Sequence, residues 1–186
     1  MPVIRPRRRT RAARMAGITL IELLVTLAIA ALVVGLGAPS FLRLLARHAV
    51  AAQAEELQDA VRVGRTEAMR RSGPVVLCRT EATSAGHCAG SGGDWQTWIL
   101  FADTDRSGTF DAGDSMLRSH LEASARMTVT SDAASIRFEA TGIAHSDAGN
   151  TTIVLTPKEG DRVQQRQVCV NTRGEVAVVA GDAACP

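Results

Sequence analysis

The feature that most constrains this chain is an apolar run from Ile18 to Ala38, in which Glu22 is the one charged residue. A run of this length matches the roughly 20 apolar residues that cross a bilayer as a helix. Six arginines and no acid precede it in the first seventeen residues. Because positive flanks stay in the cytoplasm, the sequence predicts a single span of the inner membrane, with the rest of the chain outside it.

The basic N-terminus hides the charge of the remaining chain. The whole sequence has a net charge of +2, but without the six arginines 15 basic and 19 acidic side chains remain, which gives residues 18–186 a net charge of −4. A mildly acidic body argues against nucleic acid as the main partner, because phosphate contacts need positive charge.

Three other classes of segment share this apolar pattern: a secretory signal peptide, a plain membrane anchor and a buried core helix. The signal peptide is the strongest rival, since Gly35-Leu36-Gly37 has the small residues of a cleavage site. Glu22 argues against it. A carboxylate within the bilayer costs roughly 2.5 to 3.5 kcal/mol and persists where it has a partner.

The helical pattern continues beyond the apolar run. Apolar or small residues recur three or four positions apart, at Ala46, Val50, Ala54, Leu57, Val61, Gly64 and Ala68. This spacing predicts one long helix with a buried stripe, which Ser72-Gly73-Pro74 should end. Pro39 lies inside this helix, where a proline removes a hydrogen bond and bends the axis.

The remainder of the chain reads as short strands separated by Gly, Asp, Asn and Ser clusters. The expected strands are 75–79, 95–101, 115–120, 127–130, 136–138, 151–156, 163–170 and 175–180. We therefore predict an α+β fold, in which a long N-terminal helix, transmembrane in its first half, packs on a β-rich C-terminal head. The five aromatic side chains singled out in the head, Trp95, Trp98, Phe101, Phe110 and Phe138, are expected to pack within it.

All four cysteines, Cys78, Cys88, Cys169 and Cys185, lie beyond the apolar run. An even number is typical of disulfides in an oxidising compartment. Of the three possible pairings we favour Cys78 with Cys88 and Cys169 with Cys185, since both close short loops and the second holds the C-terminus. The rival is a metal site of Cys78, His87 and Cys88, but zinc ligands usually show closer paired spacing.

The segment Gly17-Ile-Thr-Leu-Ile-Glu-Leu23 resembles the prepilin cleavage and methylation motif of type IV pilins and type II secretion pseudopilins. The resemblance implies that a prepilin peptidase cuts between Gly17 and Ile18 and methylates the new N-terminus at Ile18. It also implies that Glu22 attracts the N-terminal amine of a neighbouring subunit during assembly. Ile18 departs from the Phe that is usual at the first mature position.

The head resembles the GspH/FimT family of minor pseudopilins and minor pilins, through its strand Pro74–Cys78, the segment Trp95–Asp103, the Asp- and Gly-rich turn, and Ile136–Phe138 with Gly142. A type IV pilin-like fold follows, with a basic leader at 1–17, a transmembrane and assembly half of the helix at 18–45, and a periplasmic head at 46–186, made of a helix at 46–72 and a β-rich region at 74–186.

The function that this resemblance implies is that of a minor pseudopilin of a type II secretion system, which joins other minor and major pseudopilins in a short periplasmic filament. The main alternative is a FimT- or FimU-like minor pilin that primes type IV pili. A third possibility is a DNA receptor for uptake. Such receptors carry a C-terminal Gly-Arg-x-Arg pattern, whereas this chain has Gly174-Glu-Val-Ala177, so we expect weak DNA binding or none.

The segment from Asp103 to Asp114 fits most of a calcium-loop template, with oxygen-bearing side chains at positions 1, 3, 5, 9 and 12, glycine at position 6 and an apolar residue at position 8. Its last position is Asp rather than Glu, and strands rather than helices flank it, so we favour a polar hairpin turn. The sequence has no catalytic, P-loop or dinucleotide fingerprint. We expect no enzyme activity, no cofactor and no bound metal.

Overall fold

A computed structural model describes residues 18–81, 86–90, 93–158 and 164–186. The chain divides into two units, one that ends at Ser40 and one that runs from Phe41 to Pro186. Helix α1 (Leu20–Arg71) contributes its first part to the first unit and the rest to the second.

The first unit is a helix whose side chains are exposed. Thr19 caps its start, because its hydroxyl accepts a hydrogen bond from the amide of Glu22 (3.3 Å) and its carbonyl accepts one from Leu23 (3.1 Å). From Leu20 to Leu36 every side chain is exposed. By length and composition this is a helix able to cross a membrane. Such an apolar surface needs lipid or another protein to cover it.

The second part of α1 forms the spine of the head. All seven residues of the predicted stripe, from Ala46 to Ala68, are buried. The helix ends at Arg71, where Gly73 donates a hydrogen bond to the carbonyl of Ala68. The left-handed residue that ends it is Ser72 (φ 54°), not the glycine beside it.

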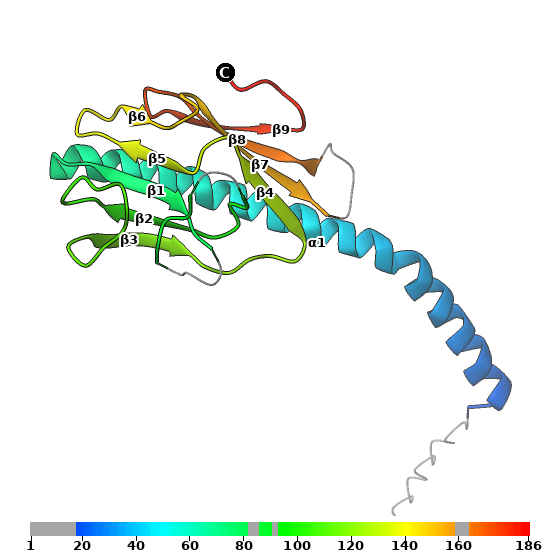
Figure 1. Cartoon of the computed structure of the whole chain (residues 1–186). Coiled ribbons are helices and arrows are strands. Elements are labelled where there is room, and N and C mark those ends of the chain that lie inside the picture. The colour runs from blue at the N-terminus through cyan, green and yellow to red at the C-terminus, as the bar shows by residue number, and fades with distance from the viewer. Residues whose placement is uncertain (1–17, 82–85, 91–92, 159–163) are drawn as a thin grey trace, which may run out of the picture. The chain divides into compact units, whose positions relative to one another are not determined.

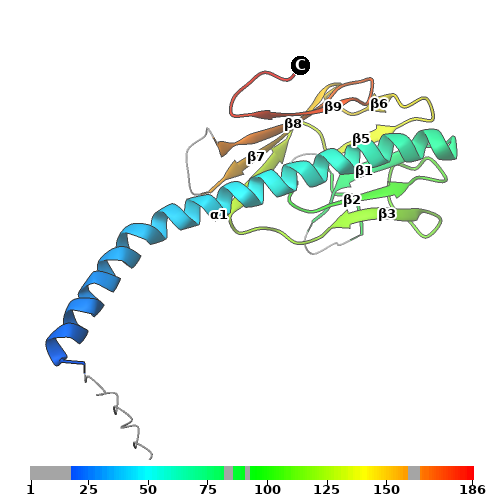
Figure 2. The ribbon, with the colours of Figure 1, turned by 180° about the vertical axis from the view of Figure 1, so that it is seen from behind.

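Two antiparallel sheets complete the head (Figures 1 and 2). The strands are β1 (Val75–Arg79), β2 (Trp98–Ala102), β3 (Ser115–His120), β4 (Met127–Ser131), β5 (Ser135–Phe138), β6 (Ala144–His145), β7 (Thr151–Pro157), β8 (Arg166–Val170) and β9 (Val176–Ala180). Their order is β3-β2-β1-β5-β6 in one sheet and β4-β7-β8-β9 in the other. Both views place the head part of α1 along the strands. The predicted α+β fold, a long helix packed on a β-rich head, is confirmed.

The strands differ from the predictions by more than one residue in three places. Trp95 lies before β2 and not in it, because its indole turns inward and donates a hydrogen bond to the carbonyl of Ala133 (2.7 Å). Strand β8 starts at Arg166, and the residue from which we expected it to start, 163, lies outside the described residues. The short strand β6 was not predicted, since two residues carry no readable alternation.

The main core lies between α1 and the two sheets. Trp95, Trp98 and Phe138 are fully buried there, as the sequence analysis predicted. Gly64 brings the helix close to β2 and β5, because a Cβ atom at this position would lie 2.8 Å from Cε2 of Phe138 and 3.1 Å from Cδ1 of Leu100.

A second, smaller core lies on the other face of the first sheet. It consists of Val76, Cys78, Ile99 and Phe101, against which Cys88 and Phe110 pack. The rings of Phe101 and Phe110 meet edge to face with their centroids 5.3 Å apart. Strands β1 and β2 are therefore covered on both faces, which explains why all their residues are buried.

Candidate functional site

Glu22 lies in the first turn of α1 and is exposed among apolar side chains. Ile18 is 74% exposed and Ile21 is 67% exposed. Among the described residues Glu22 takes part in no ion pair. The geometry is therefore that of a carboxylate on an apolar surface, at the end of the helix where a partner from another chain is able to reach it.

The other predicted processing residues are placed only in part. Gly17 lies outside the described residues. Ile18 lies two residues before the first residue of α1, Leu20, and is not part of the helix. The scissile bond that we predict between them therefore stands next to extended or irregular backbone at Ile18 and Thr19, before the first helical residue, Leu20.

The structure joins all four cysteines in disulfides. Cys78 bonds to Cys88, with Cα atoms 5.5 Å apart, and Cys169 bonds to Cys185, with Cα atoms 5.6 Å apart. This is the pairing favoured from the short loops. Because both thiols of the rival zinc site are bonded to each other, Cys78 and Cys88 are not metal ligands in this structure. The second bond ties the C-terminal segment to β8.

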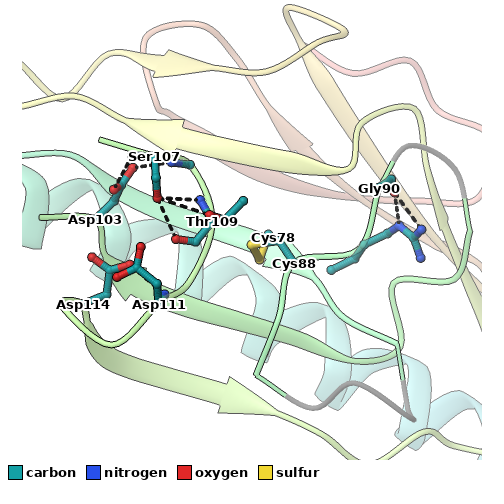
Figure 3. The surroundings of a disulfide bond; sticks show 10 residues. Cys78, Cys88, Gly90, Asp103, Ser107, Thr109, Asp111 and Asp114 are labelled. Atoms are coloured by element: carbon teal, nitrogen blue, oxygen red, sulfur yellow. Dashed lines mark hydrogen bonds between the residues drawn. A yellow bond between two sulfur atoms is a disulfide. The ribbon is translucent and has the colours of Figure 1, made fainter. Parts of the chain in front are cut away.

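Three carboxylates of the loop between β2 and β3 converge, so that oxygen atoms of Asp103, Asp105 and Asp114 lie within 4.8 Å of one another. Figure 3 shows this turn beside the Cys78–Cys88 bond. Backbone amides occupy much of the acceptor capacity: Asp103 accepts from Ser107 (3.1 Å) and Gly108 (3.0 Å). Asp and Gly turn chemistry accounts for this arrangement, as the hairpin interpretation proposed.

The two ends of this turn also bind each other. Asp114 accepts hydrogen bonds from the amides of Thr104 (2.8 Å) and Asp111 (3.2 Å).

Burial raises the pKa of Asp103, and the nearby Asp114 adds to the rise. The amide of Ser107 lowers the pKa of Asp105. Because the pKa of Asp103 is higher in the folded state than in the unfolded state, this residue makes the head less stable as the pH rises from its unfolded-state pKa to its folded-state pKa.

We expect Asp103→Ala to lower the free energy of unfolding by about 2 kcal/mol, because the amide of Gly108 loses its acceptor and the amide of Ser107 keeps only Asp105. In the hairpin interpretation this loss is the same with added calcium and with a chelator. Urea unfolding followed by tryptophan fluorescence in both buffers measures it. If calcium raises the urea midpoint of the wild type but not that of Asp103→Ala, the turn interpretation is wrong and a cation site is favoured.

The segment that replaces the Gly-Arg-x-Arg pattern is held by its own charges. The guanidinium of Arg173 donates two hydrogen bonds to Oε2 of Glu175, at 3.1 and 2.9 Å, and Asn171 donates a third at 2.8 Å. The bond from Asn171, followed by those from Arg173, lowers the pKa of Glu175. Arg173 is therefore paired with a carboxylate, which reduces the positive charge that it offers to a phosphate.

Sequence reasoning missed the contacts that join β3 to α1. Arg118 pairs with Asp59 (2.7 Å), and Nδ1 of His120 lies 3.0 Å from a carboxylate oxygen of Glu56. The His120 ring also stacks on Trp98 with centroids 6.0 Å apart. No signal in the sequence links residues about sixty positions apart. The pairs of Glu67 with Arg70 and Arg71 are different, because their spacing of three and four on a helix is readable from sequence.

Comparison with known proteins identifies relatives of the head. The family profile described as "Type II transport protein GspH" matches residues 53–174. This range begins inside the buried part of α1 and ends at Gly174, so it covers most of the head and more than half of the chain. No curated protein matches the chain.

Solved structures show the same fold at low sequence identity. Two crystal forms of the type IV minor pilin FimU from Pseudomonas aeruginosa match with TM-scores of 0.56 and 0.52, both at 17% identity. The first match covers 75% of this chain and 94% of FimU. The minor pseudopilin EpsH from the type 2 secretion system of Vibrio cholerae matches with a TM-score of 0.49 and 13% identity, over 70% of this chain and 96% of that one.

Proposed function

Because the chain belongs to the GspH family of type II transport proteins, we propose that it is a minor pseudopilin subunit that enters a short periplasmic filament of a type II secretion system. The observation that carries the proposal is the exposed apolar part of α1 in front of a GspH head. Lipid covers this surface before assembly, and the helices of other subunits cover it afterwards. Both environments are apolar, so both shield the same side chains from water.

The leader prepares the subunit for this transfer. A prepilin peptidase removes residues 1–17 and methylates Ile18. The cut takes away the six arginines that hold the N-terminus in the cytoplasm. The span then keeps Glu22 as its one charged side chain, together with a new terminal amine.

The same features imply a location. The arginines place the N-terminus in the cytoplasm, and the single span places the head in the periplasm. The two disulfides of the head support this orientation, since disulfides persist in oxidising compartments. GspH proteins are structural subunits, and we propose no catalytic role for this one.

Glu22 provides the test of the subunit role. We propose that its carboxylate pairs with the terminal amine of a neighbouring subunit, which supplies the partner that a buried charge requires. Glu22→Val should insert into the membrane normally, because the span becomes more apolar. Its recovery with the other pseudopilins in a pull-down should fall by at least about tenfold, the effect of losing roughly 1.4 kcal/mol.

The matched control is Thr26→Val, one turn further along the same exposed helix, which removes a hydroxyl that bonds only to the carbonyl of Leu23 within the described chain. This variant should assemble as the wild type does. If Glu22→Val is recovered with its partners as efficiently as Thr26→Val, the role assigned to Glu22 is wrong.

A minor pilin that primes type IV pili is the second candidate, because the likeness to FimU extends over nearly all of that chain. The fold serves both systems. The neighbouring genes separate them: genes for a secretion ATPase and secretin support the first candidate, and a pilus cluster supports the second.

For the DNA-receptor alternative, we expect the head (residues 46–186) to bind DNA weakly or not at all. Arg173 is paired with Glu175, and the charge of residues 18–186 is negative, so the main attractive term is missing. An electrophoretic shift assay at low salt measures this. Micromolar or tighter affinity that disappears in Arg173→Ala would reverse the conclusion, whereas Arg118→Ala serves as a control on another strand.

A further inference from the structure

Strand β9 lies at one edge of the second sheet, and within the described part of the chain it pairs with β8 alone. Its sequence is Val-Ala-Val-Val-Ala, with no charged residue and no proline. An edge strand presents a row of backbone donors and acceptors with which another chain is able to pair, so proteins usually protect such edges with charges, prolines or bulges. β9 has neither a charge nor a proline, and its register with β8 is regular.

The other edge strands that the structure describes are protected. β3 contains Arg118, and its register against β2 is shifted in the middle. β4 is covered at its centre, because the amide of Val129 donates to the carboxylate of Asp94 (3.2 Å) and the carbonyl of Val129 accepts from the amide of Trp95 (2.8 Å). β6 is only two residues long. The unprotected edge is therefore a particular property of β9.

The register of β8 and β9 shows which backbone groups of β9 face outward. At the two ends of the pair, the amide of Asn171 donates to the carbonyl of Glu175 (3.1 Å) and the amide of Gly181 donates to the carbonyl of Gln165 (3.0 Å). Because hydrogen-bonded pairs alternate along an antiparallel ladder, the odd-numbered residues of β9 bond to β8. The groups that point away from β8 are therefore the amides and carbonyls of Val176, Val178 and Ala180.

The C-terminal segment leaves these outward groups without a partner. It folds over the outer face of the sheet, where Cys185 is bonded to Cys169 and its Sγ lies 3.5 Å from Oγ1 of Thr152. The side-chain amide of Gln167 on the same face donates to the carbonyl of Ala183 (3.3 Å). Among the described residues, no turn, loop or tail forms a backbone hydrogen bond with the outward groups of β9.

We propose that β9 pairs antiparallel with β9 of a second copy of this chain, so that two heads share one continuous sheet. With Val178 on the two-fold axis, Val176 of each copy faces Ala180 of the other. Each of the three outward residues has one donor and one acceptor, which gives about six hydrogen bonds between the copies. The same surface is used by both partners, so the assembly closes at two. This inference goes beyond the proposed subunit role and concerns the head alone.

Charge favours a second copy as the partner of β9. The strand has no charged residue, so antiparallel self-pairing brings no like charges opposite each other. Arg173, whose side chain is 76% exposed, precedes the strand, and the exposed Asp182 follows it. Antiparallel pairing brings Arg173 of each copy towards Asp182 of the other. Glu175 also lies near this end, but its carboxylate already accepts hydrogen bonds from Arg173 and Asn171.

Amide hydrogen exchange tests this pairing. The full-length protein, in an excess of detergent micelles, is labelled over a series of protein concentrations, and fragmentation mass spectrometry resolves single amides. We expect the amide of Val178 to exchange about tenfold more slowly when about nine in ten chains are paired, because only the unpaired edge exchanges. The amide of Val179, which bonds to β8, should be protected at every concentration. Light scattering should show two protein chains where Val178 is protected.

A proline variant makes the result specific to the edge. Ala180→Pro removes one outward amide and places a ring against the second strand, while the bonds between β9 and β8 remain. Its dissociation constant for pairing should rise at least about tenfold, the effect of losing roughly 1.4 kcal/mol. The control is Ala123→Pro, the same change in the exposed segment between β3 and β4. It should pair as the wild type does, and both variants should keep buried tryptophans by fluorescence.

Three outcomes would overturn the proposal. Val178 exchange that stays the same at all concentrations would do so: fast exchange means that nothing pairs with the edge, and slow exchange means that the chain covers its own edge. Equal pairing of Ala180→Pro and Ala123→Pro would place the contact elsewhere. Protection of Val178 that requires added pseudopilins would assign the edge to a strand of a different subunit. All three leave the subunit role intact, since the pull-down of Glu22→Val tests that role separately.

Discussion

Gly17→Asp should leave all of the protein in the membrane as the full-length precursor, with no detectable mature form. The prediction follows from the position of Gly17, directly before an apolar span whose fifth residue is Glu22. A glycine offers the peptidase backbone without a side chain, whereas aspartate adds a negative charge and bulk at the bond to be cut. Intact mass spectrometry of the purified protein distinguishes the two forms by the mass of residues 1–17.

Ala13→Asp is the matched control, since it adds the same charge within the leader but away from the bond. It should be processed, and the mature wild-type chain should begin at methylated Ile18. A mature N-terminus near Ala38 would instead show that the run is a secretory signal peptide cut after Gly35-Leu36-Gly37. In that case the assembly role of Glu22 would fail as well, because Glu22 would leave with the signal.

Gly64→Leu should destabilise the head by about 3 kcal/mol, near the upper end for overpacking a core. A Cβ atom at Gly64 already falls 2.8 Å from Cε2 and 2.9 Å from Cδ2 of Phe138. The Phe138 ring is fully buried within the core and has no exposed space into which to turn. Urea unfolding of residues 46–186, followed through the buried Trp95 and Trp98, measures the loss.

The variant Glu55→Leu is the control, because it adds the same side chain to the exposed face of α1, and it should change stability by at most about 0.5 kcal/mol.

For Gly64→Ala, a gain of about 1 kcal/mol in helix propensity offsets part of the clash. The double variant Gly64→Leu/Phe138→Ala should lose less than the sum of its parts, by about 1 kcal/mol or more. If Gly64→Leu unfolds at the same urea concentration as the wild type, the helix is not held this close to β5.

Much of the architecture could be predicted from the sequence, because it depends on the spacing of residues that lie close together in the chain. The stripe from Ala46 to Ala68 follows the helical period, and every predicted member of it is buried. Apolar alternation bounded by turn residues located eight of the nine strands to within a few residues. The segments Pro74–Cys78, Trp95–Asp103 and Ile136–Phe138 indicated the GspH/FimT family, and the GspH profile over residues 53–174 confirms it.

Local patterns were less informative where a residue's role depends on partners elsewhere. The sequence placed Trp95 in a strand, but the carbonyl of Ala133, far along the chain, turns its indole inward. The aspartates from 103 to 114 suggested either a cation loop or a turn, and the structure supplies the amides that bind Asp103 and Asp114.

By itself, then, the sequence determined the apolar run, the positive charge of the first seventeen residues, the long helix, the number and spacing of most strands, and the family. These depend on periods of two and 3.6 residues and on the length of a bilayer, all of which act along the chain. Only the tertiary structure decided the strand order, the pairing of β3 with α1 through Arg118 and His120, and the close approach at Gly64. The physical reason is that such contacts join residues distant in sequence, and their free energy depends on burial and distance, which no local pattern encodes.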